Sequence, residues 1–475
     1  MTDRSALDLD HATMQRIGRR VADVVAEHLA TLREQRVNVE GIPLETRRRL
    51  HAAAPEEGAD FDALLETLRS DVLAYTGREP HPGFMAYIPS CPTFPAVMGD
   101  WLATGWNVFA GVWGIAEGPN VIELTVLDWF RQWLGMPEGS SGLLTNGGSG
   151  ATLIATVAAR HRVVGDDYAR LPKLTLYTSD QAHSAVARAA WIAGIPRTNV
   201  RALPTDDEFR LRPSDLRAAI AADRAAGLVP MAVAVSAGTT NTGTVDPLHE
   251  IADLCAEEGI WLHADAAYGG FAVLTERGKR ALDGIERCDS VALDPHKWLF
   301  MPFECGCLMM REPQRLHDAY QVLPDYLVDV APDEDRVNFS DRGTQLTRQS
   351  RALKVWLGVR YFGLAAIRDA IDGAMDLTLH AERLVRAEPL LEVTSPTRLS
   401  VLCFRVHPEG VDDTAELDAL NERVNAAVNA DGRWLISSTR VRGAFTLRLC
   451  IVGHRTTRED VEGVIGKIVE LARAG

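Results

Sequence analysis

The sequence predicts an α/β protein with a mainly parallel sheet in a large domain and a small α+β domain at the C-terminus. Between about residues 80 and 355, short β-rich runs alternate with helical stretches, which is the pattern of parallel βαβ units. After about residue 356 the order changes to a helix, then strands, then a final helix. We therefore divide the 475 residues into an N-terminal helical segment over 1–85, a large domain over 86–355 and a small domain over 356–475.

The N-terminal segment is expected to form amphipathic helices. Apolar side chains recur at helical spacing from His11 to Leu32, and a second such stretch runs from Phe61 to Val72 after a break that contains Pro and Gly. These helices carry apolar faces, and the segment is too short to bury them by itself. We expect the faces to pack on a partner or on the main domain.

The strands of the parallel sheet are expected at short β-rich runs. They are Leu174 to Tyr177, Met231 to Val235, Ile260 to His263 and Ser290 to Leu293. In the clearest unit, a polar turn leads to a helix that Asp246 caps, with Pro247 in its first position and Gly259 at its end. Open sheets of this kind bind ligands where the strands end, so a site is expected in the loops that follow them.

The small domain is expected to hold two strands and a terminal helix. The strands run from Leu399 to Val406 and from Phe445 to Ile451, and the helix runs from Arg458 to Ala474. The chain shows no internal repeat and no low-complexity tract.

The composition excludes several classes of protein. With 46% hydrophobic and 24% charged residues it is ordinary for a soluble enzyme, and no apolar run approaches the roughly 20 residues of a membrane span. The first five residues are polar with no apolar core behind them, so we expect no secretory signal and a cytoplasmic protein. A net charge of -15, with 50 basic residues scattered among 65 acidic ones, argues against nucleic-acid binding.

The seven cysteines do not indicate a metal site. Cys305 and Cys307 alternate along an apolar segment, so both thiols are expected to pack as small hydrophobic groups. A metal would need further ligands, and none stands nearby in the sequence. Reduced thiols also agree with a cytoplasmic location.

Lys297 is the candidate reactive residue. It follows His296 in a motif, Asp294 to Trp298, at the end of an apolar strand. A lysine amine condenses with an aldehyde to form a Schiff base, and an aldehyde cofactor such as pyridoxal phosphate then acts as an electron sink. Most lysines are solvated surface charges, so this interpretation depends on the other residues near the strand ends.

Two further features suit the same cofactor. The glycine-rich turn from Thr145 to Thr152 enters a helix, whose free backbone N–H groups could hold a phosphate. Most such turns bind nothing, so the turn is weak support by itself. Asp265 follows another strand and could pair with the pyridinium nitrogen, which keeps the ring protonated; its alternative role is a helix cap.

Two polar residues complete the set. His183 follows the strand that ends at Tyr177 and could stack its imidazole over the cofactor ring, although a lone histidine is more often structural. Thr240 follows the Met231 strand, and its hydroxyl could touch the cofactor or that imidazole. Glycine turn, histidine, threonine, aspartate and lysine occur in the order that a pyridoxal-phosphate enzyme of the aspartate-aminotransferase type, fold type I, needs.

From about His81 nearly to its end, the sequence resembles the group II pyridoxal-phosphate decarboxylases, and among them the aromatic-L-amino-acid decarboxylases. The matching pieces are His81 to Tyr87, Asp180 to Ser184, Trp261 to Tyr268 and Pro295 to Trp298. The resemblance implies a homodimer with its active site at the subunit interface and N-terminal helices that wrap the partner.

The resemblance also implies roles for individual residues. Lys297 would bind pyridoxal phosphate covalently, Asp265 would pair with the ring nitrogen, His183 would stack on the ring and Thr240 would support that histidine. The remaining cofactor positions are Gly148, Ser149, Ala267 and His296, and the substrate positions are Tyr87, Ser90 and Phe109.

One position departs from the family pattern. In the family a tyrosine on a mobile loop returns a proton to Cα. Our alignment of Val337 to Arg342 with that loop puts Phe339 at the tyrosine position, and phenylalanine there resembles the aldehyde synthases, which use dioxygen and release an aldehyde, ammonia and hydrogen peroxide. Tyr326 or His183 could supply the proton instead. Decarboxylation to an amine is the first hypothesis and aldehyde formation is the second.

The substrate is expected to be an aromatic L-amino acid of the tryptophan, tyrosine, phenylalanine or DOPA class. The region after Tyr87 is aromatic-rich, which suits an apolar pocket, although core packing is the commoner role for such residues. Glutamate is disfavoured because the pocket motifs hold no paired basic residues. Two other possibilities stay open: a catalytically silent protein of the same fold, and a transaminase, for which no arginine is clearly available to bind a second carboxylate.

Overall fold

A computed structural model of the chain describes residue 5, residues 7–321 and residues 336–474. Its larger sheet has the strand order β2-β8-β7-β6-β5-β3-β4. Neighbours from β4 to β7 pair in parallel, whereas β8 is antiparallel to both β7 and β2, so the expected mainly parallel sheet is confirmed. The strands are β2 (Ser141–Thr145), β3 (Leu174–Ser179), β4 (Val200–Leu203), β5 (Val229–Ser236), β6 (Trp261–Asp265), β7 (Ser290–Leu293) and β8 (Gly306–Met310).

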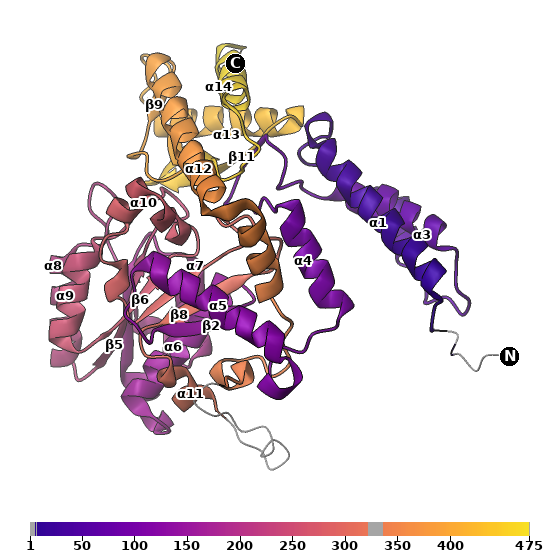
Figure 1. Ribbon diagram of the computed structural model, residues 1–475. Helices are drawn as coiled ribbons and strands as arrows, with labels where there is room; N and C mark the ends of the chain where they lie inside the picture. The colour runs from indigo at the N-terminus through magenta and orange to yellow at the C-terminus, as the bar shows by residue number, and fades with distance from the viewer. Residues whose placement is uncertain (1–4, 6, 322–335, 475) are drawn as a thin grey trace.

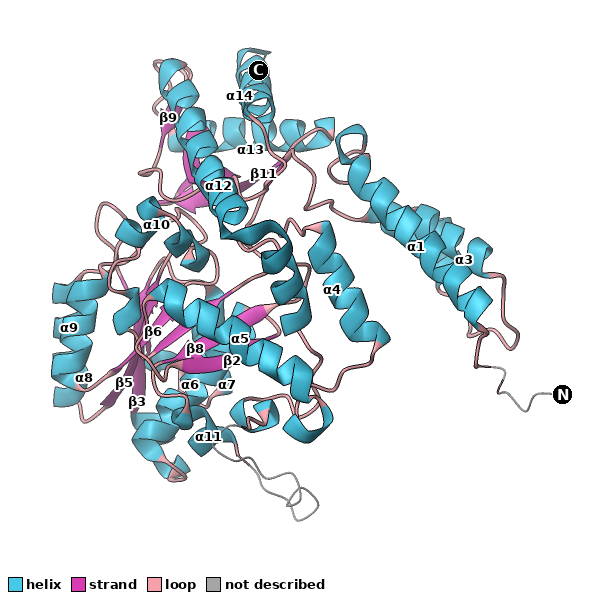
Figure 2. Cartoon of the chain, viewed as in Figure 1, coloured by secondary structure: helices cyan, strands magenta, loops and turns pink. Residues whose placement is uncertain are grey.

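Helices surround this sheet (Figure 2). Every residue of β3 and β7 is buried, which is why these strands appear in the sequence as continuous apolar runs. The helices of this part are α5 (Glu117–Leu134), α6 (Gly148–Val164), α7 (Ser184–Ile192), α8 (Pro213–Ala225), α9 (Leu248–Glu258), α10 (Glu276–Ala281) and α11 (Gln314–Tyr320).

The βαβ unit after β5 agrees with the sequence prediction except at its helix start. Gly259 ends α9 in the left-handed conformation, as predicted. However, Pro247 stands at the N-cap rather than inside the helix, and Asp246 does not cap α9. The buried Asp246 carboxylate instead accepts hydrogen bonds from the backbone N–H groups of Leu211 and Ser236, each at 2.7 Å. Asp246 therefore holds the end of β5 rather than the start of the helix.

A second sheet has the order β1-β11-β12-β10-β9. Its strands are β1 (Phe84–Met85), β9 (Leu391–Val393), β10 (Val401–Val406), β11 (Leu435–Val441) and β12 (Ala444–Cys450), and its helices are α12 (Ala352–Ala387), α13 (Thr414–Asp431) and α14 (Arg458–Ala474). The predicted strands correspond to β10 and β12, and the predicted last helix is α14. The predicted boundary at residue 355 falls inside α12, whose one non-helical residue among those described is Gly363.

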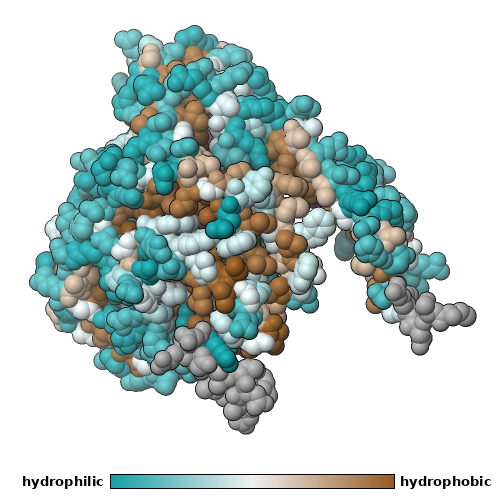
Figure 3. All heavy atoms as spheres, in the orientation of Figure 1, coloured by the Kyte–Doolittle hydropathy of each residue, from teal (hydrophilic) through white to brown (hydrophobic). Residues whose placement is uncertain are grey.

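The N-terminal helices form an arm that projects from the body (Figure 1). The arm contains α1 (His11–Ala30), α2 (Leu44–Leu50) and α3 (Phe61–Thr67), and α4 (Phe94–Gly105) follows on the body. No residue of α1 or α3 is buried in the single chain. Figure 3 shows apolar side chains gathered on the face of the body that carries α5 and α12. The large apolar residues that the single chain leaves exposed include Val121 of α5, Tyr361 and Phe362 of α12, Trp101 and Leu102 of α4, and Trp106 directly after α4.

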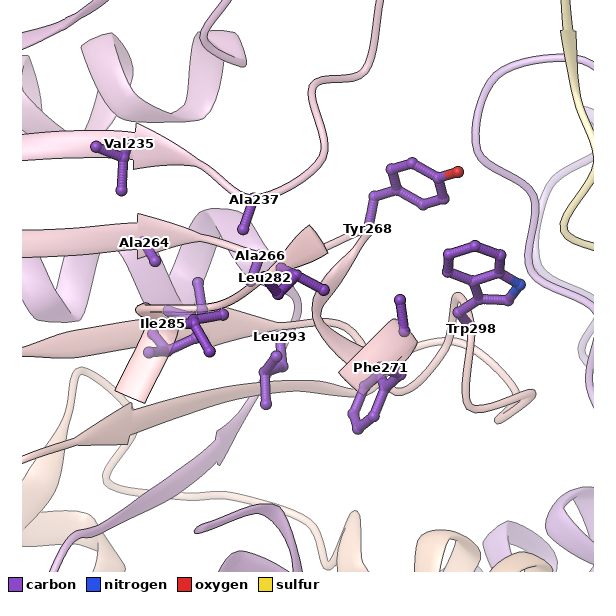
Figure 4. Close-up of a cluster of buried hydrophobic side chains, with 14 of the residues drawn as sticks. Val235, Ala237, Ala264, Ala266, Tyr268, Phe271, Leu282, Ile285, Leu293 and Trp298 are labelled. Atoms are coloured by element: carbon purple, nitrogen blue, oxygen red, sulfur yellow. The ribbon is translucent and has the colours of Figure 1, made fainter. Parts of the chain in front are cut away.

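One large apolar core extends through both sheets. Figure 4 shows the part where β5, β6 and β7 end: Val235, Ala264 and Leu293 lie in the layer of strands, and the rings of Tyr268 and Trp298 face each other beyond them. These two rings are stacked with their centres 5.1 Å apart. Within the described ranges, no helix is both long and apolar enough to cross a bilayer.

Candidate functional site

A cavity of about 280 Å³ lies at the carboxyl ends of β5, β6 and β7, beside the start of α6. This is the position that the parallel strand order predicts for a ligand site. The cavity is lined by all eight residues that were expected to hold a cofactor, namely Gly148, Ser149, His183, Thr240, Asp265, Ala267, His296 and Lys297. Residues that are up to 149 positions apart in the sequence therefore meet at one site.

The N-terminus of α6 forms one wall of the cavity. Gly147 precedes the helix with φ 113°, and no side chain caps the first turn, so the N–H groups of that turn are free to bind an anion. Gly148 lies close to the opposite wall: a Cβ atom there would stand 2.9 Å from the Cβ of Ala267 and 3.2 Å from an oxygen of Asp294. The absence of a side chain keeps this wall open.

Lys297 lies in the turn after β7, and its amine forms an ion pair with Asp294. Lys297 Nζ is 2.9 Å from Asp294 Oδ2, and Asp294 is almost fully buried. The other carboxylate oxygen, Asp294 Oδ1, is buried without a partner among the described residues. Sequence reasoning assigned no role to Asp294, although its place three residues before the lysine, at a strand end, was a usable signal.

The two histidines of the cavity are held in fixed orientations. His183 is the N-cap of α7, and its Nδ1 accepts from the N–H of Ala185 at 3.2 Å, so Nε2 carries the proton of the neutral ring. His296 Nδ1 donates to the carbonyl oxygen of Cys305 at 2.7 Å. Burial is the main cause that lowers the pKa of His296, which favours its neutral form. His183 is thus both a structural cap and a wall of the cavity.

Asp265 ends β6 beside Ser236 of β5 and lines the cavity. One of its oxygens accepts from the N–H of Ala267 at 3.2 Å, in the turn that follows the strand. Asp265 is not a helix cap, because the next helical turn begins at Gly270 and has Gly269 at its N-cap. Behind Thr240, the buried hydroxyls of Thr239, Thr242 and Thr244 bond to one another. This network stiffens the loop that carries Thr240.

The three expected substrate residues do not line the cavity of the single chain. Tyr87 is 67% exposed and has a left-handed φ of 53°, and its N–H donates to Ser437 Oγ. Ser90 is buried and donates to the carbonyl oxygen of Met301 at 3.1 Å. Phe109 is half-buried and forms an isolated β-bridge with Gln349.

Phe339 also lies away from the cavity. Its side chain is fully buried in the apolar core, with the guanidinium carbon of Arg348 4.9 Å from the ring centre. Arg348 in turn forms a buried ion pair with Glu123. The alignment placed Phe339 at the position of the catalytic tyrosine, but the Phe339 side chain does not line the cavity. Tyr326, the alternative proton donor, lies outside the described residues.

The groups that meet in the cavity fit pyridoxal phosphate. Free N–H groups of α6 suit the phosphate, the Asp265 carboxylate suits the pyridinium nitrogen, and the Lys297 amine suits the aldehyde. No group of three or more metal-ligating side chains occurs among the residues that the structure describes. Cys305 and Cys307 are buried free thiols, in agreement with their predicted packing role.

Comparisons with known proteins agree with this chemistry. A family described as the pyridoxal-dependent decarboxylase conserved domain matches residues 43–407. The aromatic-L-amino-acid decarboxylase of Bacillus atrophaeus is 36% identical over 98% of this chain and 97% of its own length. The phenylacetaldehyde synthase of Petunia hybrida is 30% identical over 93% of this chain and 91% of its own. The crystal structure of Oryza sativa TDC with PLP and tryptamine superimposes with a TM-score of 0.94 at 28% identity and covers 99% of each chain.

Proposed function

This chain belongs to the pyridoxal-dependent decarboxylase family, and we propose that it converts an aromatic L-amino acid into the corresponding amine and carbon dioxide. Its fold is fold type I, the aspartate-aminotransferase type. The observation that carries the proposal is the meeting of Lys297, Asp265 and His183 in one cavity beside the uncapped start of α6.

Each of these residues has a task toward pyridoxal phosphate. When bound, the cofactor supplies an electron sink that stabilises the electron pair released as the bond to the carboxylate breaks. Lys297 would provide the amine for covalent attachment, Asp265 would pair with the ring nitrogen, and the N–H groups of Gly148 and Ser149 would hold the phosphate. His183 would offer its imidazole to the ring, and its Nδ1 is already used at the start of α7.

An aromatic substrate is supported by the walls of the cavity and by the relatives. Phe303 and Tyr268 line it, and the Phe303 ring lies 4.8 Å from the His296 ring. Arginine is absent from the lining formed by the described residues, so a second substrate carboxylate has no guanidinium partner there. Both features favour an apolar, aromatic side chain over a glutamate-like one.

The test is a substrate panel with a lysine variant. Purified protein is incubated with tryptophan, tyrosine, phenylalanine and DOPA, and amine, aldehyde and peroxide are assayed. Lys297→Ala is expected to lose turnover and the absorption band of the bound cofactor. Lys279→Ala, a change at an exposed lysine on α10 paired with Glu276, is the matched control and is expected to keep both. Peroxide without amine contradicts the proposed product.

Aldehyde formation is the second candidate, and the similarity to a phenylacetaldehyde synthase favours it. The proton donor decides between the products, because a protonated Cα yields the amine. We expect Tyr326→Phe to shift the product from amine toward aldehyde and peroxide. Phe339→Tyr is expected to leave the product ratio unchanged, because position 339 is buried in the core. If Phe339→Tyr changes the ratio of amine to aldehyde and Tyr326→Phe does not, position 339 is the catalytic tyrosine position after all.

The working assembly that we propose is a cytoplasmic homodimer with the active site at the subunit interface. The arm of N-terminal helices has apolar side chains that its own chain leaves exposed, including Met14, Leu64 and Leu68. Tyr87 and Phe109, which do not line the cavity of one chain, are then candidates to contact substrate after a second chain has docked. All seven cysteines are free thiols, as expected in a reducing compartment.

A further inference from the structure

Asn241 connects the loops of the cavity with the smaller sheet. It directly follows Thr240, which lines the cavity. From β11, Thr439 Oγ1 donates to the Asn241 side-chain oxygen at 3.0 Å. The Asn241 backbone carbonyl accepts from Arg448 Nε of β12 and from the Cys403 thiol of β10, each at 3.2 Å. Three strands of the smaller sheet therefore bond to one residue of a cavity loop.

The same side chain also reaches the loop that carries His183. Asn241 Nδ2 donates to Gln181 Oε1 at 3.2 Å, and Gln181 stands two residues before His183. Both ends of the Asn241 amide are thus used: the oxygen faces the Thr439 hydroxyl and the nitrogen faces Gln181. An amide that is held at both ends has one orientation. The position of the His183 loop therefore depends on the position of β11.

The network continues to the segment of Tyr87. Arg448 Nη1 donates to Ser437 Oγ at 2.9 Å, and the N–H of Tyr87 donates to the same oxygen at 3.2 Å. Strand β1, which ends two residues before Tyr87, pairs in parallel with β11. The smaller sheet therefore contacts the Tyr87 segment on one side and Asn241 on the other.

We propose that Asn241 is a positioning residue that couples the smaller sheet to the two loops that carry His183 and Thr240. This inference rests on the proposed function, since it assigns those loops to the cofactor site. Loss of the Asn241 amide removes the hydrogen bond to Gln181, so the loop that carries His183 can move more. The backbone N–H of Asp180, in the same loop, still donates to the carbonyl oxygen of Leu203 in β4, so the loop keeps one of its anchors in the variant.

The experiment compares Asn241→Ala, Gln181→Ala and the double variant with wild type. Visible circular dichroism of the bound cofactor reports how the ring is held, and hydrogen exchange of residues 178–186 in cofactor-free protein reports the loop itself. Asn241→Ala is expected to weaken the dichroic band, to speed that exchange and to lower kcat/KM about tenfold. The double variant is expected to match Asn241→Ala, because the two side chains act through one bond.

Asn429→Ala is the matched control. Asn429 also bridges to β11, through two bonds with the backbone of Ile436 at 2.9 and 3.1 Å, but it lies on α13 and does not line the cavity. This variant is expected to lower the melting temperature without a change in the dichroic band, the loop exchange or kcat/KM. An Asn241→Ala protein that behaves like Asn429→Ala overturns the coupling role.

Failure of the proposed function gives a different result. If wild-type protein turns over no aromatic amino acid, the product assay fails in every variant alike. The dichroic band and the loop exchange still respond to Asn241→Ala if the coupling exists. Unchanged values of both, in protein that binds the cofactor, reject the inference independently of substrate.

Discussion

The side chains of the cavity differ in how firmly they are held. His183 and His296 are each fixed through Nδ1, one as an acceptor from Ala185 and the other as a donor to Cys305. Lys297 is held by an ion pair to Asp294, which its amine can leave without breaking any element of the fold. Fixed rings and a movable amine suit a site in which the lysine bonds to a cofactor and is later released.

Gly148 lies where we propose that the phosphate of the cofactor binds. In Gly148→Ala, the new Cβ would crowd Ala267 and Asp294 at 2.9 and 3.2 Å and narrow the part of the cavity where we propose that the phosphate binds. We expect the dissociation constant of pyridoxal phosphate to rise at least about tenfold. The measurement is a fluorescence titration of cofactor-free protein.

The control for this change is Gly373→Ala in α12, where an added Cβ meets nothing within 4 Å. That variant should keep the wild-type dissociation constant and be slightly more stable, since alanine favours the helix. Equal affinities of both variants would argue that the phosphate lies elsewhere.

At the scale of elements, α6 is tied to two strands beneath the cavity by a buried polar chain. Trp261 Nε1 donates to Ser290 Oγ at 2.8 Å, and that hydroxyl contacts His263 Nδ1 at 2.9 Å. His263 Nε2 then lies 3.3 Å from the hydroxyl of Thr152, one turn into α6. Helix α6, β6 and β7 are thereby joined, so the start of α6 keeps its position relative to Asp265 at the end of β6.

His263 makes this junction sensitive to acid. Burial lowers the pKa of His263 from 6.5 to about 4 in the folded chain. Between these values the unfolded chain binds a proton that the folded chain does not, so the contribution to stability is complete above pH 6.5 and is lost as the pH falls toward 4. We compare the free energy of unfolding of wild type with that of His263→Asn. We expect the difference between them to be about 2 kcal/mol smaller at pH 4.5 than at pH 7.

Urea denaturation of cofactor-free protein at the two pH values measures this difference. The use of cofactor-free protein removes any change in cofactor affinity from the comparison. If the difference in unfolding free energy is the same at both pH values, the pKa of His263 is the same in the folded and unfolded chains.

For the molecule as a whole, the cavity lies where the loops of the larger sheet meet the smaller sheet. Besides Asn241, the buried hydroxyl of Tyr268 bonds to Ser400, just before β10, at 2.6 Å. We propose that the chain divides into an N-terminal helical segment over 1–85, a large domain over 86–355 and a small domain over 356–475. Helix α12 crosses the boundary between the last two, and strand β1 joins the arm to the smaller sheet.

The proposed dimer depends on the apolar side chains of the arm. Leu64 and Leu68 are half-exposed apolar residues at the arm, and burial of both on a second chain favours association. We expect the Leu64→Glu, Leu68→Glu double variant to shift from a mass twice the 51.9 kDa of one chain toward that of a single chain. Light scattering after size-exclusion chromatography measures the mass.

Tyr168→Glu is the control, because this exposed aromatic residue lies on the large domain rather than on the arm. It is expected to keep the mass of wild type. If wild type already has the mass of one chain, the dimer proposal is wrong. If the double variant remains a dimer, the arm is not the interface.

The sequence alone was sufficient for the parts of this protein that depend on local pattern. Alternating β-rich and helical runs predicted the parallel strands and α14, because side-chain periodicity follows directly from backbone geometry. The order of the glycine turn, His183, Thr240, Asp265 and Lys297 predicted a common site, because parallel strands end at the same edge of a sheet. The strands β1, β2, β4, β9 and β11 were missed. β1, β4 and β9 are too short to carry a clear period, β2 contains Gly142, and β11 contains the polar run Ser437 to Arg440.

Other features were decided only by tertiary structure, because they depend on which distant side chains meet. Asp246 has the sequence context of a helix cap, yet its carboxylate binds two backbone N–H groups, one of them 35 residues away. Phe339 fell at a catalytic position by alignment, but packing puts it in the core. The partners of Asn241 lie 60 to 207 residues away in the sequence, and no local spacing encodes them, since hydrogen bonds and burial are set by three-dimensional proximity.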